Sequence, residues 1–319
     1  MTKTSQPFRL LPILRPRIWG RHSLAPYHLD VPAGQPVGEM WFTFEENATS
    51  LDRPLGDLLR HHPEILGQAT LPQYPGVCPL LIKLLFTSSR LSVQVHPEDT
   101  YAAEHHESLG KTEAWYVLQS EPPGEVAVGF REPMTLERLR DSAHSGEIER
   151  LLDWRKVNTG DVVFVPAGTV HAIGAGLTIC EIQQNSDITY RLYDYGRPRE
   201  LHLDHGCRVS HLGPHLYKPQ INTLAPWRDH LVSCPYFHIE RLRLDRPVRV
   251  AANLPHYLLL VCVGGSGLLA GKPFTLGQTW MLPAGGESVI LDGSGSEWIL
   301  AYTAEEPTGA LSEVSPVGP

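Results

Sequence analysis

The sequence predicts a mainly β protein made of two similar β-barrels with a few short helices. Its 319 residues contain 28 glycines and 28 prolines, and runs of strand length rich in Val, Ile, Leu, Phe and Tyr lie between them. The pattern Gly-x5-Pro-x-Gly-x2-His at residues 160–171 recurs at residues 277–288 with Ser in place of His. This repeat predicts two barrels, which we place at residues 1–220 and 221–319.

Each copy of the repeat predicts a strand between two turns. A glycine turn enters the strand, and Pro and Gly then form a second turn, after which the next residue is expected to point into the barrel. The first copy carries His171 at that position and the second carries Ser288. Only the first barrel can therefore offer a metal ligand there, and the second is expected to be metal-free.

Helical periodicity is confined to a few short stretches. Apolar side chains recur at helical spacing in residues 51–66 and 134–154, and a further helix is expected after Pro97. These segments predict short helices packed on the sheets. The N-terminal residues, up to about residue 50, are expected to add strands to either barrel.

The composition excludes several classes of protein. Charged residues make up 19% of the chain and hydrophobic ones 42%, as is usual for a soluble globular protein. A net charge of -8 argues against sequence-independent nucleic-acid binding, which needs a concentrated positive surface. Pro12 interrupts the apolar N-terminal patch, so no secretory signal is predicted, and no apolar run is long enough for a membrane span.

The five cysteines form no C-x-x-C pair, and we expect buried free thiols and a cytoplasmic location. The oligomeric state is not predicted.

Four residues of metal-ligand type lie in segments that are typical of strands. In residues 91–99, alternation places Gln94 and His96 on one face and the two neighbouring valines on the other. Glu113 and His171 occupy two further strand-like segments. One amide, two imidazoles and one carboxylate predict an open zinc site with room for water or substrate. Manganese, cobalt or iron would also suit these ligands.

Two more polar side chains are expected on the same inward face. Lys111 precedes Glu113 by two residues, and Ser92 precedes Gln94 by two. An ammonium group inside a barrel needs an anionic partner, which a substrate could supply. The alternatives are a solvated lysine and a serine bonded to the backbone.

The motifs of this chain together resemble one enzyme family. Gly-x5-Pro-x-Gly-x2-His is the second signature of the cupin superfamily of double-sheet jelly rolls. Other matching segments are Arg17-Ile-Trp-Gly20, Gly38-Glu-Met-Trp41, Pro79-Leu-Leu-Ile-Lys83, Leu91-Ser-Val-Gln-Val-His-Pro97, Gly110-Lys-Thr-Glu-Ala-Trp-Tyr116 and Glu181-Ile-Gln-Gln-Asn-Ser-Asp-Ile-Thr-Tyr-Arg191. The set is similar to type I mannose-6-phosphate isomerases of the short bacterial form. The likeness runs to about Leu212, and the C-terminal third resembles the family's second, ligand-free barrel only in outline.

The resemblance implies a zinc-dependent aldose–ketose isomerase that interconverts mannose 6-phosphate and fructose 6-phosphate through a cis-enediol. It implies two cupin-type jelly rolls, and it places one zinc ion per chain on the same four residues, Gln94, His96, Glu113 and His171. Substrate breadth is left open.

The resemblance also suggests roles for residues around the metal. Arg191 corresponds to the residue usually assigned as catalytic, and Lys111 and Asp187 are candidates for proton transfer. The substrate is expected to be bound by Ser92, Lys111 and Arg197. The serine and the arginine would contact its phosphate group. Arg197 could instead pair with Asp194 or Glu200 at the surface. Longer family members often have a histidine just before this lysine, whereas this chain has Gly110, so the general base stays open.

Two other functions are compatible with the same fold. A dioxygenase would need only two histidines and one carboxylate, which His96, Glu113 and His171 provide. A non-catalytic cupin could bind a phosphosugar without turning it over. Gln94, Lys111 and Arg191 favour the isomerase, because an oxygenase does not need them.

Overall fold

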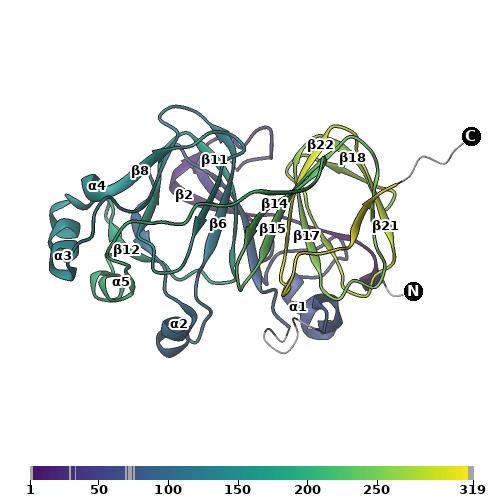
Figure 1. Ribbon diagram of the computed structural model, residues 1–319, viewed down its shortest axis with the longest axis horizontal. Coiled ribbons are helices and arrows are strands. Elements are labelled where there is room, and N and C mark those ends of the chain that lie inside the picture. The colour runs from purple at the N-terminus through teal and green to yellow at the C-terminus, as the bar shows by residue number, and fades with distance from the viewer. Residues whose placement is uncertain are drawn as a thin grey trace, which may run out of the picture.

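The computed structural model describes residues 3–28, 30–32, 34–68, 70, 74 and 76–314. Two lobes lie side by side along the long axis, the first drawn mainly in purple to teal and the second mainly in green to yellow (Figure 1). Strands dominate both lobes, so the predicted mainly β fold class is confirmed.

The described residues form 23 strands, of which β1 is treated below and the other 22 divide equally between the two lobes. In the first lobe they are β2 (Ile13–Arg21), β3 (Val37–Trp41), β4 (Leu80–Phe86), β5 (Val93–Val95), β6 (Glu113–Ser120), β7 (Glu125–Phe130), β8 (Leu152–Lys156), β9 (Val162–Val165), β10 (His171–Ile173), β11 (Leu177–Gln184) and β12 (Tyr190–Tyr193). In the second they are β13 (Asn222–Ala225), β14 (Arg228–Ser233), β15 (His238–Leu244), β16 (Val248–Val250), β17 (Leu258–Gly264), β18 (Ser266–Leu269), β19 (Lys272–Thr275), β20 (Thr279–Leu282), β21 (Val289–Asp292), β22 (Ser296–Tyr302) and β23 (Leu311–Glu313).

The second lobe repeats the strand order of the first. The first lobe has one sheet in the order β2-β3-β4-β11-β6-β9 and another in the order β12-β5-β10-β7-β8. The second lobe has β13-β14-β15-β22-β17-β20 and β23-β16-β21-β18-β19. Strand β13 thus corresponds to β2, β14 to β3, and so on until β23 corresponds to β12. Each lobe is a roll of two sheets, as the repeated motif predicted.

The N-terminal segment contributes to both rolls. Strands β2 and β3 belong to the first roll, whereas β1 (Phe8–Leu10) pairs antiparallel with β20 and extends the large sheet of the second roll. A division of the chain at residue 220 stays a prediction, and β1 belongs with the second roll by its hydrogen bonds.

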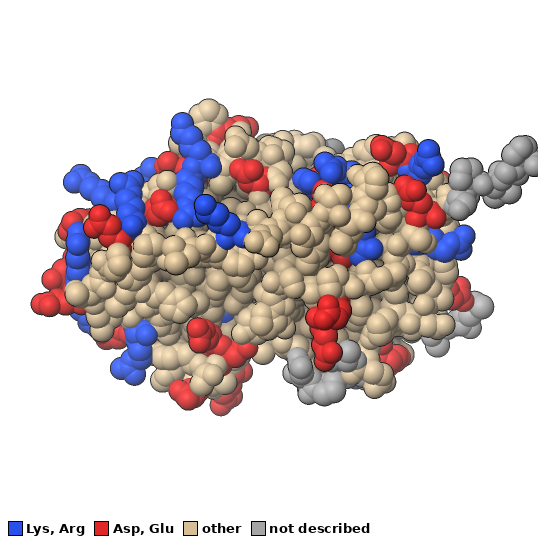
Figure 2. Space-filling view, in the orientation of Figure 1, with Lys and Arg blue, Asp and Glu red and all other residues tan. Residues whose placement is uncertain are grey.

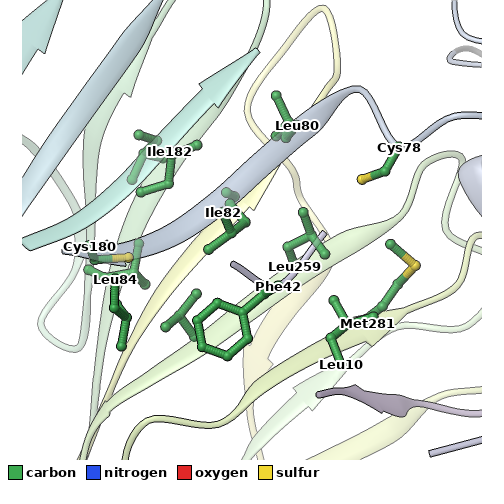
Figure 3. Packing of buried hydrophobic residues seen from close by; sticks show 14 of the residues in the cluster. Leu10, Phe42, Cys78, Leu80, Ile82, Leu84, Cys180, Ile182, Leu259 and Met281 are labelled. Atoms are coloured by element: carbon green, nitrogen blue, oxygen red, sulfur yellow. The ribbon is translucent and has the colours of Figure 1, made fainter. Parts of the chain in front are cut away.

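The main hydrophobic core lies between the two rolls. Apolar side chains from the large sheet of each roll meet there, and Figure 3 shows Leu80, Ile82 and Leu84 of β4 near Leu259 of β17 and Met281 of β20. Because side chains alternate along a strand, the residues between them point the other way, into the first roll. Strand β4 is buried on both faces, so any polar side chain on it is held inside the protein.

The predicted helices are present, with different ends. Residues 51–66 form α1 (Leu55–His61) and the 3-10 helix η2 (Pro63–Leu66), and α2 (Asp99–His106) follows Pro97. Residues 134–154 form α3 (Leu136–Ser145) and α4 (Ile148–Leu151), but the prediction was wrong beyond residue 151, where β8 begins. The helix α5 (Leu203–Val209) was not predicted.

Helices α3, α4 and α5 pack on the outer face of the small sheet of the first roll. Buried apolar side chains such as Leu139, Ile148 and Cys207 meet Val93 and Val95 of β5 there. These two valines point outward to the helices, as the alternation in residues 91–99 predicted. Their neighbours Gln94 and His96 are therefore turned into the roll.

The repeated motif forms the same turns in both rolls, with one difference at its last position. Gly160, Gly168, Gly277 and Gly285 all have positive φ, between 66° and 91°, which explains the choice of glycine. The expectation that Ser288 points inward is wrong. It is exposed, and its hydroxyl donates to the Val250 carbonyl at 2.9 Å.

All five cysteines are free, and four are buried, whereas Cys234 is only partly so. Among the described residues, no helix has the length and apolar character needed to cross a membrane. On the face shown in Figure 2, Lys and Arg side chains gather over the upper part of the first lobe with acidic side chains beside them, and the middle of the molecule is largely uncharged.

Candidate active site

Three of the four predicted metal ligands meet inside the first roll. His96 directly follows β5, His171 begins β10 and Glu113 begins β6, so each lies at the end of a strand. The pairing of His171 with Gln94 across β10 and β5 fixes their register. Their ligand atoms lie within 4.8 Å of one another, and all three residues are buried. The fold thus brings together two imidazoles and one carboxylate from three strands.

Hydrogen bonds hold both imidazoles in the orientation that a metal requires. Nδ1 of His96 lies 2.8 Å from the Ile188 carbonyl, and Nδ1 of His171 lies 2.9 Å from the Thr169 carbonyl. A carbonyl only accepts, so each Nδ1 carries the proton and each Nε2 has a free lone pair. Nε2 of His171 lies 3.3 Å from Glu113 Oε1, and Nε2 of His96 lies 3.6 Å from Glu113 Oε2. Both lone pairs are directed toward the carboxylate.

Burial keeps these imidazoles uncharged. It lowers the pKa of His171 to about 4, and it lowers the pKa of His96 well below its ordinary value, helped by the nearby charge of Lys111. At neutral pH both histidines are therefore neutral, which is the form that binds metals.

Lys111 and Glu113 show that this cluster attracts positive charge. The Lys111 ammonium contacts the Glu113 carboxylate and lies 2.9 Å from His96 Nε2. Burial alone would lower the pKa of Lys111, but the negative charge of Glu113 outweighs it and raises that pKa. Oε1 of Glu113 is buried and has no hydrogen-bond donor among the described residues. Two neutral imidazoles and a carboxylate with an unpartnered oxygen fit a divalent metal ion.

A cleft of about 480 Å³ opens beside this cluster. Five predicted site residues line it: Ser92, Gln94, Lys111, Asp187 and Arg191. Gln94 also approaches the metal cluster, since its Nε2 lies 3.2 Å from His171 Nε2, and its Oε1 accepts a hydrogen bond from Ser92 at 3.3 Å. The predicted substrate and metal residues therefore share one continuous site.

Comparison with known proteins decides the family. The sequence profile of the phosphomannose isomerase type I catalytic domain matches residues 8–132. Mannose-6-phosphate isomerase ManA of Bacillus subtilis is 35% identical over 313 residues, which cover 91% of this chain and 97% of that protein. The chain belongs to the type I phosphomannose isomerase family. Mannose-6-phosphate isomerase of Streptococcus mutans is 33% identical and covers 92% of this chain and 95% of its own length.

Solved structures share the fold of this chain. The crystal structure of mannose 6-phosphate isomerase from Bacillus subtilis superposes with a TM-score of 0.83 at 28% identity, covering 93% of this chain and 99% of that one. A putative mannosephosphate isomerase from Archaeoglobus fulgidus has a TM-score of 0.76 at 19% identity, covering 93% and 97%, and shows the same fold.

Three arginines soon after β11, at positions 191, 197 and 199, have different surroundings in the structure. Arg191 lines the cleft and donates to the Glu200 carbonyl at 2.7 Å, while its Nε is buried without a partner among the described residues. Burial lowers the pKa of Arg191, and the positive charge of Arg199 lowers it further. An anion placed here would relieve both effects.

Arg197 does not line the cleft, in contrast to its predicted role. Its guanidinium donates to the Arg90 carbonyl and lies 3.8 Å from the Asp194 carboxylate, the partner considered as an alternative, although Asp194 is buried and not at the surface. Arg199 lines the cleft instead, and it forms a two-pronged pair with Asp194, with both bonds at 2.6 Å. The sequence shows a second arginine two residues after Arg197, but nothing in the sequence indicates which of the two lines the cleft.

Two further charged residues of the cleft, Lys83 and Arg17, were not predicted as site residues from the sequence. Lys83 is buried and donates to Gln183 at 2.7 Å, and its ammonium lies 3.5 Å from Glu181 on the neighbouring strand. Arg17 donates to Glu39 at 2.8 Å at another side of the cleft. The signal for Lys83 was available, because it is the one charged residue in the apolar run that forms β4.

Gly110, where longer relatives were expected to carry a histidine, is required by packing in this chain. A Cβ there would lie 2.6 Å from the backbone nitrogen of Asp99, and the Gly110 amide donates to the Asp99 carboxylate. No side chain fits at this position without moving the start of α2.

Proposed function

We propose that this phosphomannose isomerase family member interconverts mannose 6-phosphate and fructose 6-phosphate with the help of one divalent metal ion, which we expect to be zinc. The observation that carries the proposal is the buried His96–Glu113–His171 cluster beside a cleft lined by lysines and arginines. A cytoplasmic location and the absence of nucleic-acid partners stay predictions from composition.

Four side chains would hold the metal. Nε2 of His96, Nε2 of His171 and the Glu113 carboxylate already point toward one another. Gln94 would complete the set through its Oε1, which requires its amide to turn over. When bound there, the ion would polarise a carbonyl or hydroxyl oxygen of the open-chain sugar and stabilise negative charge on it.

The cleft residues supply the remaining requirements of an aldose–ketose conversion. A proton must move between C1 and C2, and negative charge develops on the sugar oxygens in the transition state. Arg191 would stabilise that charge, because its partly unsatisfied guanidinium lines the cleft. Lys111 and Asp187 line the same cleft and are the candidates for proton transfer. Gly110 cannot contribute, so the base must come from these residues or from water.

The phosphate would lie at the arginine end of the cleft. Ser92 can donate a hydrogen bond from its hydroxyl to the phosphate. We assign to Arg199 the phosphate-binding role that the sequence suggested for Arg197, since of these two arginines only Arg199 lines the cleft. A guanidinium binds phosphate through two parallel hydrogen bonds, and the phosphate would compete with Asp194 for it. Phosphate bound remote from the reacting carbons would orient the sugar over the metal.

A coupled assay tests this function. Purified protein should convert mannose 6-phosphate to fructose 6-phosphate and should exchange the C2 proton with solvent deuterium. Prolonged treatment with a chelator should abolish both activities, and one equivalent of zinc per chain should restore them. Full turnover in protein shown by elemental analysis to hold no metal would refute the metal role, and a metal-loaded protein without turnover would refute the function.

A further inference from the structure

The shared motif fixes which residues of the second roll correspond to the catalytic cleft. Val165 and Leu282 both stand directly before the motif proline. Glu113 pairs with Val165 in the first roll, and Leu258 pairs with Leu282 in the second. Leu258 therefore occupies the position of the metal ligand Glu113, and its side chain cannot coordinate a metal.

The same pairing registers identify the counterparts of two charged cleft residues. Trp115, two residues after Glu113, pairs with Glu181 and through it with Lys83, and Glu39 stands two residues before Trp41, the partner of Lys83 on β3. Leu260, two residues after Leu258, pairs with Leu300 and through it with Glu240, and Arg228 stands two residues before His230, the partner of Glu240 on β14. The second roll thus also has two oppositely charged residues at these positions, with the signs exchanged.

This pair is buried and satisfied within the protein. Arg228 donates to both carboxylate oxygens of Glu240, at 2.5 and 2.8 Å, and the Tyr302 hydroxyl donates to Glu240 at 2.6 Å. Arg228 also donates to the Thr308 carbonyl. Because Glu240 already neutralises Arg228, the second roll has no spare positive charge here for a phosphate group.

A cavity of about 610 Å³ lies between residues 251–256 and 304–310. These two loops connect β16 to β17 and β22 to β23. Their counterparts in the first roll connect β5 to β6 and β11 to β12, and they supply Lys111 and Asp187 to the catalytic cleft. The cavity therefore lies at the corresponding end of the second roll, and its size is typical of a site for a small molecule.

His256 lines this cavity and has an unused hydrogen-bonding group. Only 6% of the residue is exposed, and its ring stacks on Tyr302 with centroids 5.1 Å apart. Its Nε2 is buried and has no hydrogen-bond partner among the described residues. A buried polar atom without a partner is unfavourable, so a ligand hydroxyl that reached it would be bound favourably.

The rest of the lining selects against charged phosphosugars. Glu305 and Glu306 are exposed at this cavity, and its described lining includes no Lys or Arg. Small apolar residues such as Ala252 and Pro255 make up much of the remaining wall. Acidic groups repel a phosphate, whereas carboxylates, the Asn253 amide and apolar walls suit a molecule that carries hydroxyl groups on a carbon ring.

We propose that this cavity is a second, non-catalytic site that binds a neutral, hydroxyl-rich small molecule of the free sugar or polyol class, with His256 as its central hydrogen-bond partner. The proposal does not depend on the catalytic cleft, since Leu258 stands at the position of Glu113 and Arg228 is already paired with Glu240.

Hydrogen–deuterium exchange with free mannose as the probe tests this proposal. At about 50 mM, well above a weak millimolar Kd, mannose should slow exchange at least twofold in peptides covering residues 251–256 and 304–310. Mannose 6-phosphate at the same concentration should protect the catalytic cleft but not these peptides. Protection by both sugars alike, or by neither free mannose nor mannitol, would overturn the proposal.

Two variants separate binding from folding. Ala252→Trp fills the cavity from an exposed position and should abolish the protection while leaving isomerase activity unchanged. Leu224→Trp, at an exposed position of β13 away from this cavity, is the matched control and should keep it. His256→Gln should weaken the protection in a protein whose melting temperature is still close to that of the wild type. Undiminished protection in Ala252→Trp would contradict the proposed location.

Discussion

Replacing Arg199 by alanine is expected to weaken the binding of mannose 6-phosphate much more than it slows turnover. Arg199 lines the cleft and offers a two-pronged hydrogen-bonding group, now shared with Asp194. Hydrogen bonds to charged groups contribute about 1.5–3 kcal/mol. At 1.4 kcal/mol per factor of ten, KM should rise about 10- to 100-fold, with kcat changed less than about threefold. Steady-state rates with mannose 6-phosphate measure both constants.

Arg197 provides the matched control two residues away. It is directed to the Arg90 carbonyl and does not line the cleft, so Arg197→Ala should change KM by no more than about twofold. Asp194 is buried and would lose its main partner in Arg199→Ala. A double variant, Asp194→Asn with Arg199→Ala, leaves no unpaired charge there and so checks whether destabilisation causes the change in KM. A larger rise in KM for Arg197→Ala than for Arg199→Ala would show that the original sequence-based assignment was right.

Three further predictions follow from the geometry. Arg191→Ala should lower kcat about 100- to 1000-fold with a smaller effect on KM, and an effect confined to KM would exchange its role with that of Arg199. In chelated protein, burial lowers the pKa of folded His171 to about 4. Between about pH 6.5 and 4 the unfolded chain then binds more protons than the folded one, so the free energy of unfolding should fall as pH falls through that window. His171 alone should contribute a loss of about 3 kcal/mol at pH 4. Urea melts that do not change with pH would contradict this. Tyr116→Phe removes the 2.6 Å hydrogen bond to Glu297 between the rolls and should lower the free energy of unfolding by about 1–2 kcal/mol. Denaturant melts measure this change, and an unchanged midpoint would show that the bond does not stabilise the interface between the rolls.

The sequence predicted best what local geometry determines. Gln94 and His96 share a face because a strand alternates, and the valines beside them pack on helices as that alternation requires. The glycine and proline positions of the repeated motif predicted both rolls, since their turns need the positive φ that glycine adopts. The position of His171 at the start of β10 follows from the same turn.

Features that depend on distant pairing were beyond the sequence argument. Lys83 and Glu181 meet only because β4 pairs with β11, nearly one hundred positions later in the chain, in a particular register. Which of Arg197 and Arg199 lines the cleft depends on how the segment after β12 folds back on Asp194. Strand β1 joins the second roll, although its residues stand at the beginning of the chain.

Ser288 shows that a shared motif does not guarantee a shared orientation. Its counterpart His171 is buried and bonded to Thr169, whereas Ser288 turns outward to the Val250 carbonyl. A small hydroxyl can satisfy itself on the nearest backbone group, so nothing requires it to face the interior.

The most direct test of the central claim is a crystal structure with anomalous scattering recorded on both sides of the zinc absorption edge. Our account predicts one strong peak per chain, about 2.0–2.2 Å from Nε2 of His96, Nε2 of His171 and a carboxylate oxygen of Glu113. The Lys111 ammonium should then have moved away from that carboxylate. A zinc peak at other residues, with Lys111 still bound to Glu113, would contradict it.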